Sequence, residues 1–274
     1  MTQHTLSEII IYPVKSLSGI SVSQWPVINT GLLYDRKWML VDGAGQFLSQ
    51  RKLPRMALIK TALTDEHLIL SANGMEDLQI PLSQTDGEII RSTVWENTDN
   101  AQHVSKTADQ WLTQFLNTEC YLVFQPDDAI RQVDPDYGIA TDGVAFSDGF
   151  PFLVVSENSL AVLNQAMQLN LTMARFRPNL VISGCEGYAE DQWREITIGS
   201  IDFRLPKPCS RCSVPTIDPE TAEVSKEPLS TLNRTRKWQS KVYFGQNAIH
   251  NQTGVLAVGD ILLVKVVGDK QPPI

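Results

Sequence analysis

The feature that most constrains the fold is a succession of short β-type runs separated by turn residues. Between residues 8 and 102 these runs are rich in β-branched and aromatic residues, and pairs such as Asp42-Gly43 and Asn73-Gly74 mark turns between them. The expected strands of this half are Ile9–Val14, Ile20–Val27, Lys37–Val41, His67–Ser71 and Ile89–Trp95. So many short strands in series favour a β-barrel or a sandwich.

Two stretches change to a helical period. In Thr107–Asn117 large apolar side chains recur at helical spacing, and Thr107 with Gln110 has the form of a capping box. In Glu157–Gln168 the apolar residues share one face, and Ser156 is the expected N-cap. Each stretch predicts one amphipathic helix packed on a core.

The second half returns to strand patterns, with turns at Ser183-Gly184 and Gly199-Ser200. The expected strands are Leu180–Ser183, Glu195–Ile198, Ile201–Leu205 and Ile261–Val267. We therefore expect a mostly β chain with a few helices (α+β), organised as two β-barrel-like domains. The boundary region, residues 103–125, has no Gly/Ser-rich linker, so the halves are expected to share an interface.

Composition excludes several classes of function. The formal net charge is −8, which argues against nucleic-acid binding because that binding depends on clustered Lys and Arg. No leader-like N-terminus and no run of about 18 apolar residues is present, so we expect a cytoplasmic protein without a membrane span. Four cysteines in 274 residues are too few for a disulfide framework and fit a reducing compartment.

Two of those cysteines form the motif Cys209-Ser210-Arg211-Cys212, which lies between Pro208 and Pro215. The thiolate is the metal ligand, and a neighbouring cation such as Arg211 favours the ionised sulfur. Soft sulfur selects transition metals over calcium or magnesium. Taken alone, however, a pair of cysteines is as often a pair of small buried hydrophobes.

Four further clusters place charges inside apolar runs that look like strands. Guanidinium forks suit phosphate, and Lys, Ser and Asn can complete the contacts of its oxygens, so together these clusters suggest an anion pocket. No GxxxxGK[ST] or GxGxxG sequence occurs, which leaves P-loop and Rossmann sites without support. The clusters are Tyr12-Pro13-Val14-Lys15-Ser16, Asp35-Arg36-Lys37-Trp38, Phe146-Ser147-Asp148-Gly149 and Arg175-Phe176-Arg177-Pro178-Asn179.

The order of these motifs, YPVKS, DRKW, FSDG, RFRPNLVISG, PCSRC, TIDPET and FGQN, resembles the MOSC family (molybdenum cofactor sulfurase C-terminal domain) with its N-terminal β-barrel partner. The similarity covers about residues 6 to 266 and is greatest to the amidoxime-reducing components and the bacterial reductases of N-hydroxylated compounds. It implies a MOSC N-terminal-like β-barrel domain at residues 1–123, a MOSC domain at 124–268 and a tail at 269–274.

The resemblance also implies a molybdenum-molybdopterin cofactor (Moco). The pterin dithiolene supplies two sulfurs to the metal, and the protein supplies a third. By position in the motif, Cys212 matches the metal ligand, Cys209 is a neighbour, and Asp148 matches an acidic catalytic position near the metal. The positions implied to bind the cofactor are Lys15, Ser16, Arg36, Arg177, Asn179, Ser210, Arg211 and Asn247.

The implied activity is that of an oxidoreductase that reduces small N-hydroxylated compounds, R–NHOH to R–NH2, as a detoxification. Asp148 would relay protons or orient its neighbours. No cysteine follows Cys212, so an appended iron–sulfur domain is not expected. Electrons would then come from an external donor protein, either a flavoprotein or a haem protein.

Three other interpretations stay open. The chain could sulfurate the cofactor or transfer sulfur, although nothing resembles the pyridoxal-phosphate-dependent desulfurase of sulfurases, so that coenzyme is not expected. It could be a cofactor carrier without turnover. Cys209, Cys212 and Cys185 could also contribute to a structural zinc site.

The sequence does not identify the substrate, the electron donor, a nucleotide on the pterin or the oligomeric state. We assign no function to Cys120 and Cys185, expected as buried thiols, or to His250, expected as a polar loop histidine. Ala222 stands where relatives often carry glycine, so the resemblance does not define that turn.

Overall fold

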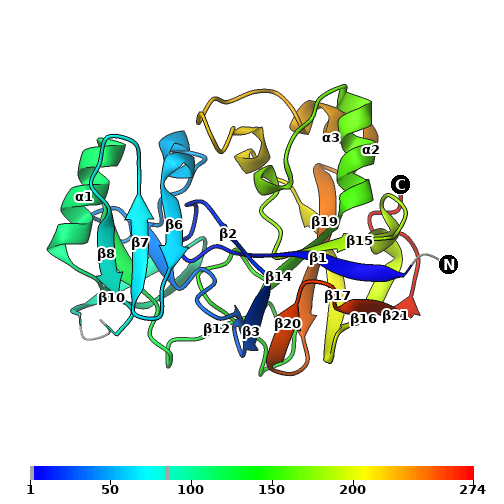
Figure 1. Cartoon of the computed structure of the whole chain (residues 1–274), viewed down its shortest axis with the longest axis horizontal. Helices are drawn as coiled ribbons and strands as arrows, with labels where there is room; N and C mark the ends of the chain where they lie inside the picture. The colour runs from blue at the N-terminus through cyan, green and yellow to red at the C-terminus, as the bar shows by residue number, and fades with distance from the viewer. Residues whose placement is uncertain (1–2, 84–86) are drawn as a thin grey trace.

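The computed structural model describes residues 3–83 and 87–274. Figure 1 shows two parts side by side, one carrying β6–β8 and α1 and the other carrying β14–β17, α2 and α3. The beginning of β1 and the C-terminus lie at the outer edge of the second part (Figure 1). No helix in the described ranges is long and apolar enough to cross a membrane.

Seven strands of the second part close into a barrel. Each strand pairs with the next around the ring, and the pairing of β14 with β19 completes it. In ring order the strands are β14 (Phe152–Ser156), β15 (Leu180–Ser183), β1 (His4–Ile11), β21 (Ile261–Val267), β16 (Trp193–Ile198), β17 (Ile201–Ser210) and β19 (Lys241–His250).

The first strand of the chain belongs to this barrel. β1 lies antiparallel between β15 and β21, which come from the second half of the sequence. Two short strands extend the sheet: β2 (Ile20–Val22) pairs with β1, and β18 (Lys237–Trp238) pairs with β19. The division at residue 123 stays a prediction, and in space the N-terminal strand completes the second part.

Alternating side chains explain how these strands pack. In β17, Ile201, Phe203 and Leu205 are buried in the barrel core, while the residues between them are partly exposed. Phe203 meets Phe152 of β14 edge-to-face, with ring centres 5.2 Å apart. One face of the strand therefore fills the barrel.

β14 is buried on both faces. Val154 belongs to the barrel core, whereas Leu153 and Val155 pack in a second cluster with Leu160 and Leu163 of α2 (Glu157–Met167). An unbroken apolar run such as Phe152–Val155 is typical of a strand covered on both sides.

The first part contains two small antiparallel sheets around a separate core. Trp38, Leu40, Met56, Leu112 and Phe115 are among its buried residues. This arrangement confirms the mostly β class with a few helices and two barrel-like parts. The sheets are β5 (Trp38–Val41) with β11 (Tyr121–Phe124), β10 (Asn97–His103) and β9 (Ile89–Val94), and β6 (Lys60–Leu63) with β7 (His67–Ser71) and β8 (Leu78–Pro81).

Short elements connect these units. They are β3 (Gln24–Ile28), β4 (Gly31–Leu32) and β20 (Gly254–Ala257) in one sheet, β12 (Arg131–Gln132) with β13 (Gly143–Val144), the helices α1 (Lys106–Leu116) and α3 (Leu229–Thr235), and the 3₁₀ helices η1 (Pro54–Leu58), η2 (Met173–Arg175), η3 (Ala189–Gln192) and η4 (Val214–Thr216).

The two longer helices lie where they were expected, but one cap was wrong. Ser156 caps α2 and accepts a hydrogen bond from the amide of Ser159 at 3.0 Å, as predicted. The N-cap of α1 is Ser105, which accepts from Ala108 N at 3.1 Å. The extended backbone of Ser105 places its hydroxyl over the first turn, so Thr107 already lies inside the helix.

Several strand limits also differ from prediction. β7, β15 and β21 match, but β1 ends at Ile11 instead of Val14, and the run from Ile20 to Val27 divides into β2 and β3. β17 continues past the expected end at Leu205 and reaches Ser210. Prolines 206 and 208 are tolerated because β16 pairs only as far as Arg204, so beyond it one edge of β17 has no ladder to break.

The α1 cap gives a direct stability test. Ser105→Ala should lower the free energy of unfolding by about 1 kcal/mol, because an amide of the first helical turn loses its acceptor. Thr107→Ala is the matched control on the same helix; this exposed residue should change the value by less than about 0.5 kcal/mol. Urea unfolding of both variants measures the difference, and a larger effect at Thr107 would contradict the observed cap.

Candidate functional site

The ten residues that the sequence analysis singled out line one cavity of about 160 Å³. The cavity lies at one end of the barrel, where β1 and β17 end and where β14 and β15 begin. Antiparallel pairing of β1 with β15 and parallel pairing of β14 with β15 place these ends together, so segments distant in sequence converge. The ten residues are Lys15, Ser16, Arg36, Asp148, Arg177, Asn179, Ser210, Arg211, Cys212 and Asn247.

Most of the motif residues lie in loops and not in strands, which corrects the expectation of strand-like runs. The first cluster follows β1, and the second precedes β5. Two cations of the motifs lie outside the cavity: Lys37 of the second cluster donates to Asp127 at 2.8 Å, and Arg175 of the fourth donates to Asp218 at 2.7 Å. The motifs thus mix cavity residues with residues that hold the loops.

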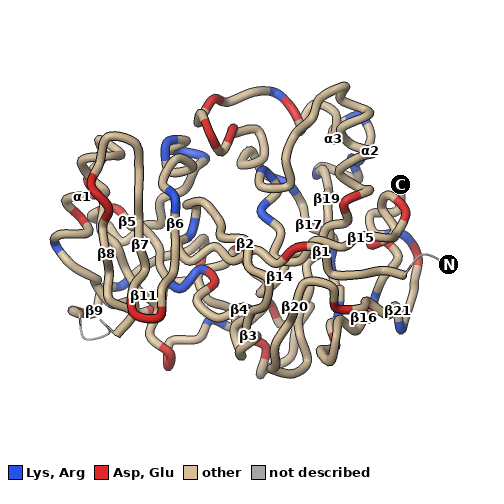
Figure 2. The backbone as a smooth tube through the Cα atoms, in the orientation of Figure 1, with Lys and Arg blue, Asp and Glu red and all other residues tan. Residues whose placement is uncertain are grey.

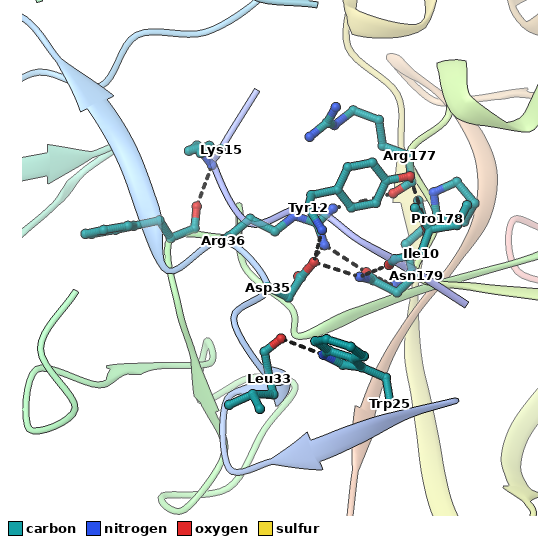
Figure 3. Close-up of polar contacts among 12 residues, drawn as sticks. Ile10, Tyr12, Lys15, Trp25, Leu33, Asp35, Arg36, Arg177, Pro178 and Asn179 are labelled. Atoms are coloured by element: carbon teal, nitrogen blue, oxygen red, sulfur yellow. Dashed lines mark hydrogen bonds and ion pairs between the residues drawn. The ribbon is translucent and has the colours of Figure 1, made fainter. Parts of the chain in front are cut away.

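A buried polar cluster anchors Arg36. Asp35 accepts hydrogen bonds from Tyr12 N at 2.8 Å and Asn179 Nδ2 at 3.2 Å, and it forms an ion pair with Arg36. Arg36 also donates to Asn179 Oδ1 at 3.0 Å. Figure 3 shows these side chains converging beside the Tyr12 ring. Asp35 therefore offsets part of the charge of Arg36, a role that the sequence analysis did not assign.

The Tyr12 ring contacts a second guanidinium. Arg177 Cζ lies 4.1 Å from the ring centre, and Arg36 Cζ lies 4.4 Å from it. Arg177 also donates to Leu17 O at 2.6 Å. Burial lowers the pKa of Arg177 to about 10, so this side chain still carries its charge at neutral pH. Its partners are a ring and a carbonyl, and that charge remains available to an anion.

Three residues of the cavity have a strained backbone conformation. Ser16, Arg36 and Arg177 have φ values of 69°, 52° and 56°, in the left-handed region that residues other than glycine seldom occupy. Strained backbone of this kind clusters at functional sites, where the surrounding contacts hold it in place. Its presence in three of the ten residues is a second mark of a site, independent of charge.

Lys15 and Asp148 form an ion pair at the cavity. Lys15 is 6% exposed and donates to Phe146 O at 2.7 Å and to Asp148 Oδ1 at 2.5 Å. Trp95 Nε1 donates to the same oxygen at 3.1 Å. Desolvation opposes ionisation of Asp148, but Lys15 and Arg51 outweigh it and hold the pKa of this carboxyl below its usual range. Asp148 is therefore a carboxylate at neutral pH.

The loop that carries Asp148 is held by cations. Arg131 of β12 is buried and donates to Ala145 O at 3.1 Å and to Ser147 O at 2.8 Å. Lys15 takes the carbonyl between them, that of Phe146. Three successive carbonyls thus have charged donors, which fixes the position of the carboxylate.

The two cysteines of the motif differ in their surroundings. Cys212 is exposed, and Arg51 Nη1 lies 3.5 Å from its Sγ. Cys209 is partly buried, and Arg211 Nη1 lies 3.1 Å from its Sγ. The motif's own arginine therefore accompanies Cys209. The cation beside Cys212 comes from another loop, where nothing in the local sequence distinguishes Arg51 from an ordinary surface arginine.

The remaining cavity residues contribute polar groups. Asn247 of β19 donates to Pro208 O at 3.5 Å, and Ser210 ends β17 with an exposed side chain. The carbonyl of Ser16 accepts from the buried Gln50 at 2.8 Å. These contacts orient the backbone around the cavity and leave hydroxyl and amide groups on its wall.

A much larger groove of about 1240 Å³ opens onto the same residues. Arg51, Asp148, Cys209, Arg211 and Cys212 line both spaces. The groove gives small molecules a path to the sulfur of Cys212. Charged residues of both signs are scattered over both parts of the molecule (Figure 2). Around the smaller cavity, by contrast, five cations and one carboxylate gather. This local excess of positive charge occurs in a chain whose net charge is −8.

The three residues to which no function was assigned, Cys120, Cys185 and His250, are all buried. Cys120 and Cys185 are buried thiols, as expected. His250 is buried at the end of β19, so the expectation of a loop histidine was wrong; it packs on the Phe152 ring. Within the described ranges no three His, Cys, Asp or Glu side chains gather as a metal site. The structural zinc interpretation therefore has no support.

Comparison with protein families gives the class of the protein. The family model described as the MOSC N-terminal beta barrel domain matches residues 3–119, and the one described as the MOSC domain matches residues 141–262. The chain belongs to the MOSC-domain family, as its motifs predicted.

Two kinds of individual proteins are similar in sequence to this chain. The chain is 35% identical to "Mitochondrial amidoxime-reducing component 1" of Homo sapiens, over 93% of this chain and 81% of the relative. It is 33% identical to "Mitochondrial amidoxime reducing component 2" of Rattus norvegicus, over 93% and 82%. It is also 34% identical to "Molybdenum cofactor sulfurase" of Arabidopsis thaliana, over 88% of this chain but 32% of that protein.

Ala222 offers a test of strain near the cysteine loop. Its φ is 60°, and its amide donates to Asp218 O at 2.8 Å, so the turn forms with alanine in a left-handed conformation. Ala222→Gly should raise the free energy of unfolding by about 1 kcal/mol. Ala161→Gly, on the exposed face of α2, is the matched control and should lower it by about 1 kcal/mol. Equal signs for the two variants would contradict the strained turn.

Asp148 provides a pH-dependent test. Asp148→Asn leaves Lys15 without its carboxylate and should lower the free energy of unfolding at pH 7 by about 1 kcal/mol, a modest value because the Asp148 side chain is 60% exposed. The pKa in the folded state is depressed, so this contribution is complete above about pH 4 and is lost as pH falls through the folded-state value. Denaturant unfolding from pH 8 to pH 3 should show the two proteins converging only below about pH 4. A gap that widens at acid pH would contradict the assignment.

Proposed function

We propose that the chain is a molybdenum-cofactor-dependent reductase of N-hydroxylated compounds. The observation that carries the proposal is the convergence of cationic side chains and an exposed thiol at one end of the barrel. Sulfur is a soft ligand suited to a transition metal, and the cations suit a phosphate-bearing cofactor. The names of the amidoxime-reducing relatives support reduction as the reaction class.

The residues present fit such a cofactor. Arg177 and Arg211 donate to carbonyl oxygens, which leaves their charges available to a phosphate. Lys15 and Arg36 are partly offset by Asp148 and Asp35, so they also serve to fix the loops. Ser16, Asn179, Ser210 and Asn247 supply hydrogen-bonding groups on the same wall.

When bound, the cofactor would supply the two-electron step by which R–NHOH, two electrons and two protons give R–NH2 and water. In this proposal Cys212 is the protein's metal ligand, since its sulfur is exposed where the groove meets the cavity. Asp148, ionised at neutral pH, can accept a hydrogen bond from a substrate N–H and orient it. A proton relay, the other predicted role, is disfavoured by the depressed pKa of this carboxyl. The electrons would come from an external flavoprotein or haem protein.

A second candidate function is cofactor sulfuration or delivery. It is favoured by the similarity to molybdenum cofactor sulfurases and by the fact that both Cys209 and Cys212 line the cavity. A sulfur carrier would show a persulfide on one cysteine by mass spectrometry. A cofactor carrier would bind molybdenum but give no turnover with reduced viologen. The cytoplasmic location and the role in detoxification stay predictions.

The decisive pair of variants is Cys212→Ser and Cys209→Ser. The purified protein should contain about one molybdenum per chain, and reduction of a hydroxylamino base by reduced viologen should fall to background in Cys212→Ser because the metal loses its protein sulfur. Cys209→Ser should keep both the metal and the activity. Thermal unfolding checks that both variants are folded, and full activity in Cys212→Ser refutes the ligand assignment.

A further inference from the structure

Arg51 is the side chain in contact with the sulfur of Cys212. It lies between β5 and η1 and lines both the cavity and the groove. Its Nη1 is 3.5 Å from Cys212 Sγ, and its Cζ lies 4.5 Å from the centre of the Trp95 ring and 5.7 Å from that of Phe47. The two rings hold the guanidinium at the sulfur.

The ring that carries Arg51 is itself fixed. Trp95 is 49% exposed at the groove and has a φ of 58°, a left-handed conformation. Its Nε1 donates to Asp148 Oδ1 at 3.1 Å, and Asp148 is tied to Lys15. A chain of contacts therefore runs from Lys15 through Asp148 and Trp95 to Arg51 and the Cys212 sulfur.

Arg51 differs from the other guanidiniums of the cavity. Arg36, Arg177 and Arg211 each donate to carbonyl or carboxylate oxygens. Within residues 3–83 and 87–274, the contacts of the Arg51 guanidinium are two rings and a sulfur. The positive charge of Arg51 also helps to lower the pKa of the Asp148 carboxyl. Because no oxygen binds it directly, its positive field acts on the sulfur and on whatever enters the groove.

We propose that Arg51 is a positioning residue of the site, whose guanidinium, held on Trp95 and Phe47, supplies the positive charge beside the Cys212 sulfur. A unit charge 3.5 Å from the exposed sulfur attracts negative charge on that atom. The same field raises the local concentration of anions at the mouth of the cavity. Both effects depend on charge and not on the shape of the arginine.

One consequence concerns redox chemistry and rests on the proposed function. A cation beside a sulfur ligand favours the state with more negative charge, so it makes the metal easier to reduce. Removing the charge should move the midpoint potential of the loaded enzyme to more negative values and lower kcat more than it raises KM. Arg51→Lys, which keeps a charge, should recover most of the shift.

The field can be measured without any cofactor. In a Cys209→Ser background Cys212 is the exposed thiol, since Cys120 and Cys185 are buried. The rate of modification by the dianionic disulfide DTNB is divided by the rate with the uncharged disulfide dithiodipyridine; the thiolate fraction cancels, so the ratio reports the local potential. Arg51→Gln should lower this ratio about fivefold, and Arg51→Lys by less than about twofold.

Arg55→Gln is the matched control. Arg55 also rests on a ring, with its Cζ 4.8 Å from the centre of Phe115, but it is exposed and lines neither space. In Arg55→Gln, the ratio of the DTNB and dithiodipyridine rates should equal that of the protein with Arg55. The midpoint potential, followed by electron paramagnetic resonance during redox titration, should also be unchanged. Trp95→Ala, which removes the stacking partner, should lower the ratio in the same direction as Arg51→Gln.

The outcomes separate the two proposals. If wild-type protein binds no molybdenum, the proposed function fails, whereas a lower reagent ratio in Arg51→Gln still supports the role of Arg51. If molybdenum is bound but Arg51→Gln changes neither the ratio nor the potential, the role of Arg51 is wrong and the proposed function stands. A ratio lowered equally by Arg55→Gln also overturns the role of Arg51, because the effect would then reflect overall charge.

Discussion

Hydrogen bonding between β14 and β19 closes the barrel, and the geometry of the candidate site depends on that closure. Closure brings the beginning of β14 beside Asn247 of β19 and the end of β17. β1, inserted between β15 and β21, adds its own end to the same rim. The loops at the ends of β1, β14, β15 and β17 are thereby held around one cavity by backbone pairing, so these loops need little regular structure.

The second constraint is the placement of positive charge inside that rim. Guanidinium groups brought close together repel one another and lose hydration. The structure offsets this with the buried Asp35, with the Tyr12 ring between Arg36 and Arg177 in the contact network, and with backbone carbonyl oxygens. The left-handed backbone at Arg36 and Arg177 adds strain. An arrangement with these unfavourable contributions is typical of a site shaped for an anionic ligand.

The sequence could predict the class of fold because strand and helix patterns are local, whereas the cavity residues followed from the resemblance of the ordered motifs to a known family. Alternating apolar runs located β7, β15 and β21, and the motif order indicated which residues lie around one space. It could not predict contacts that arise only from closure. The approach of Arg51 to Cys212 joins residues 161 positions apart, and the burial of His250 depends on the barrel around it.

Sequence patterns gave wrong helix caps and element limits where the same residues allow two structures. Thr107 and Gln110 have the spacing of a capping box. The cap is nevertheless Ser105, because its extended backbone places its hydroxyl within hydrogen-bonding distance of the amide of Ala108. α3 was missed because it has only seven residues, Leu229–Thr235, and its N-cap residue is Pro228, which has no side-chain acceptor. The extension of β17 was missed because prolines normally end a strand, whereas here one edge of the strand is unpaired.

In the proposed function, the sulfur of Cys212 binds molybdenum at the barrel end. X-ray absorption spectroscopy at the molybdenum edge tests it most directly, because it counts the sulfur neighbours of the metal. We expect molybdenum to have one sulfur neighbour fewer in Cys212→Ser than in the wild type, and the same number in Cys209→Ser as in the wild type. The same sulfur count in wild type and Cys212→Ser would contradict it.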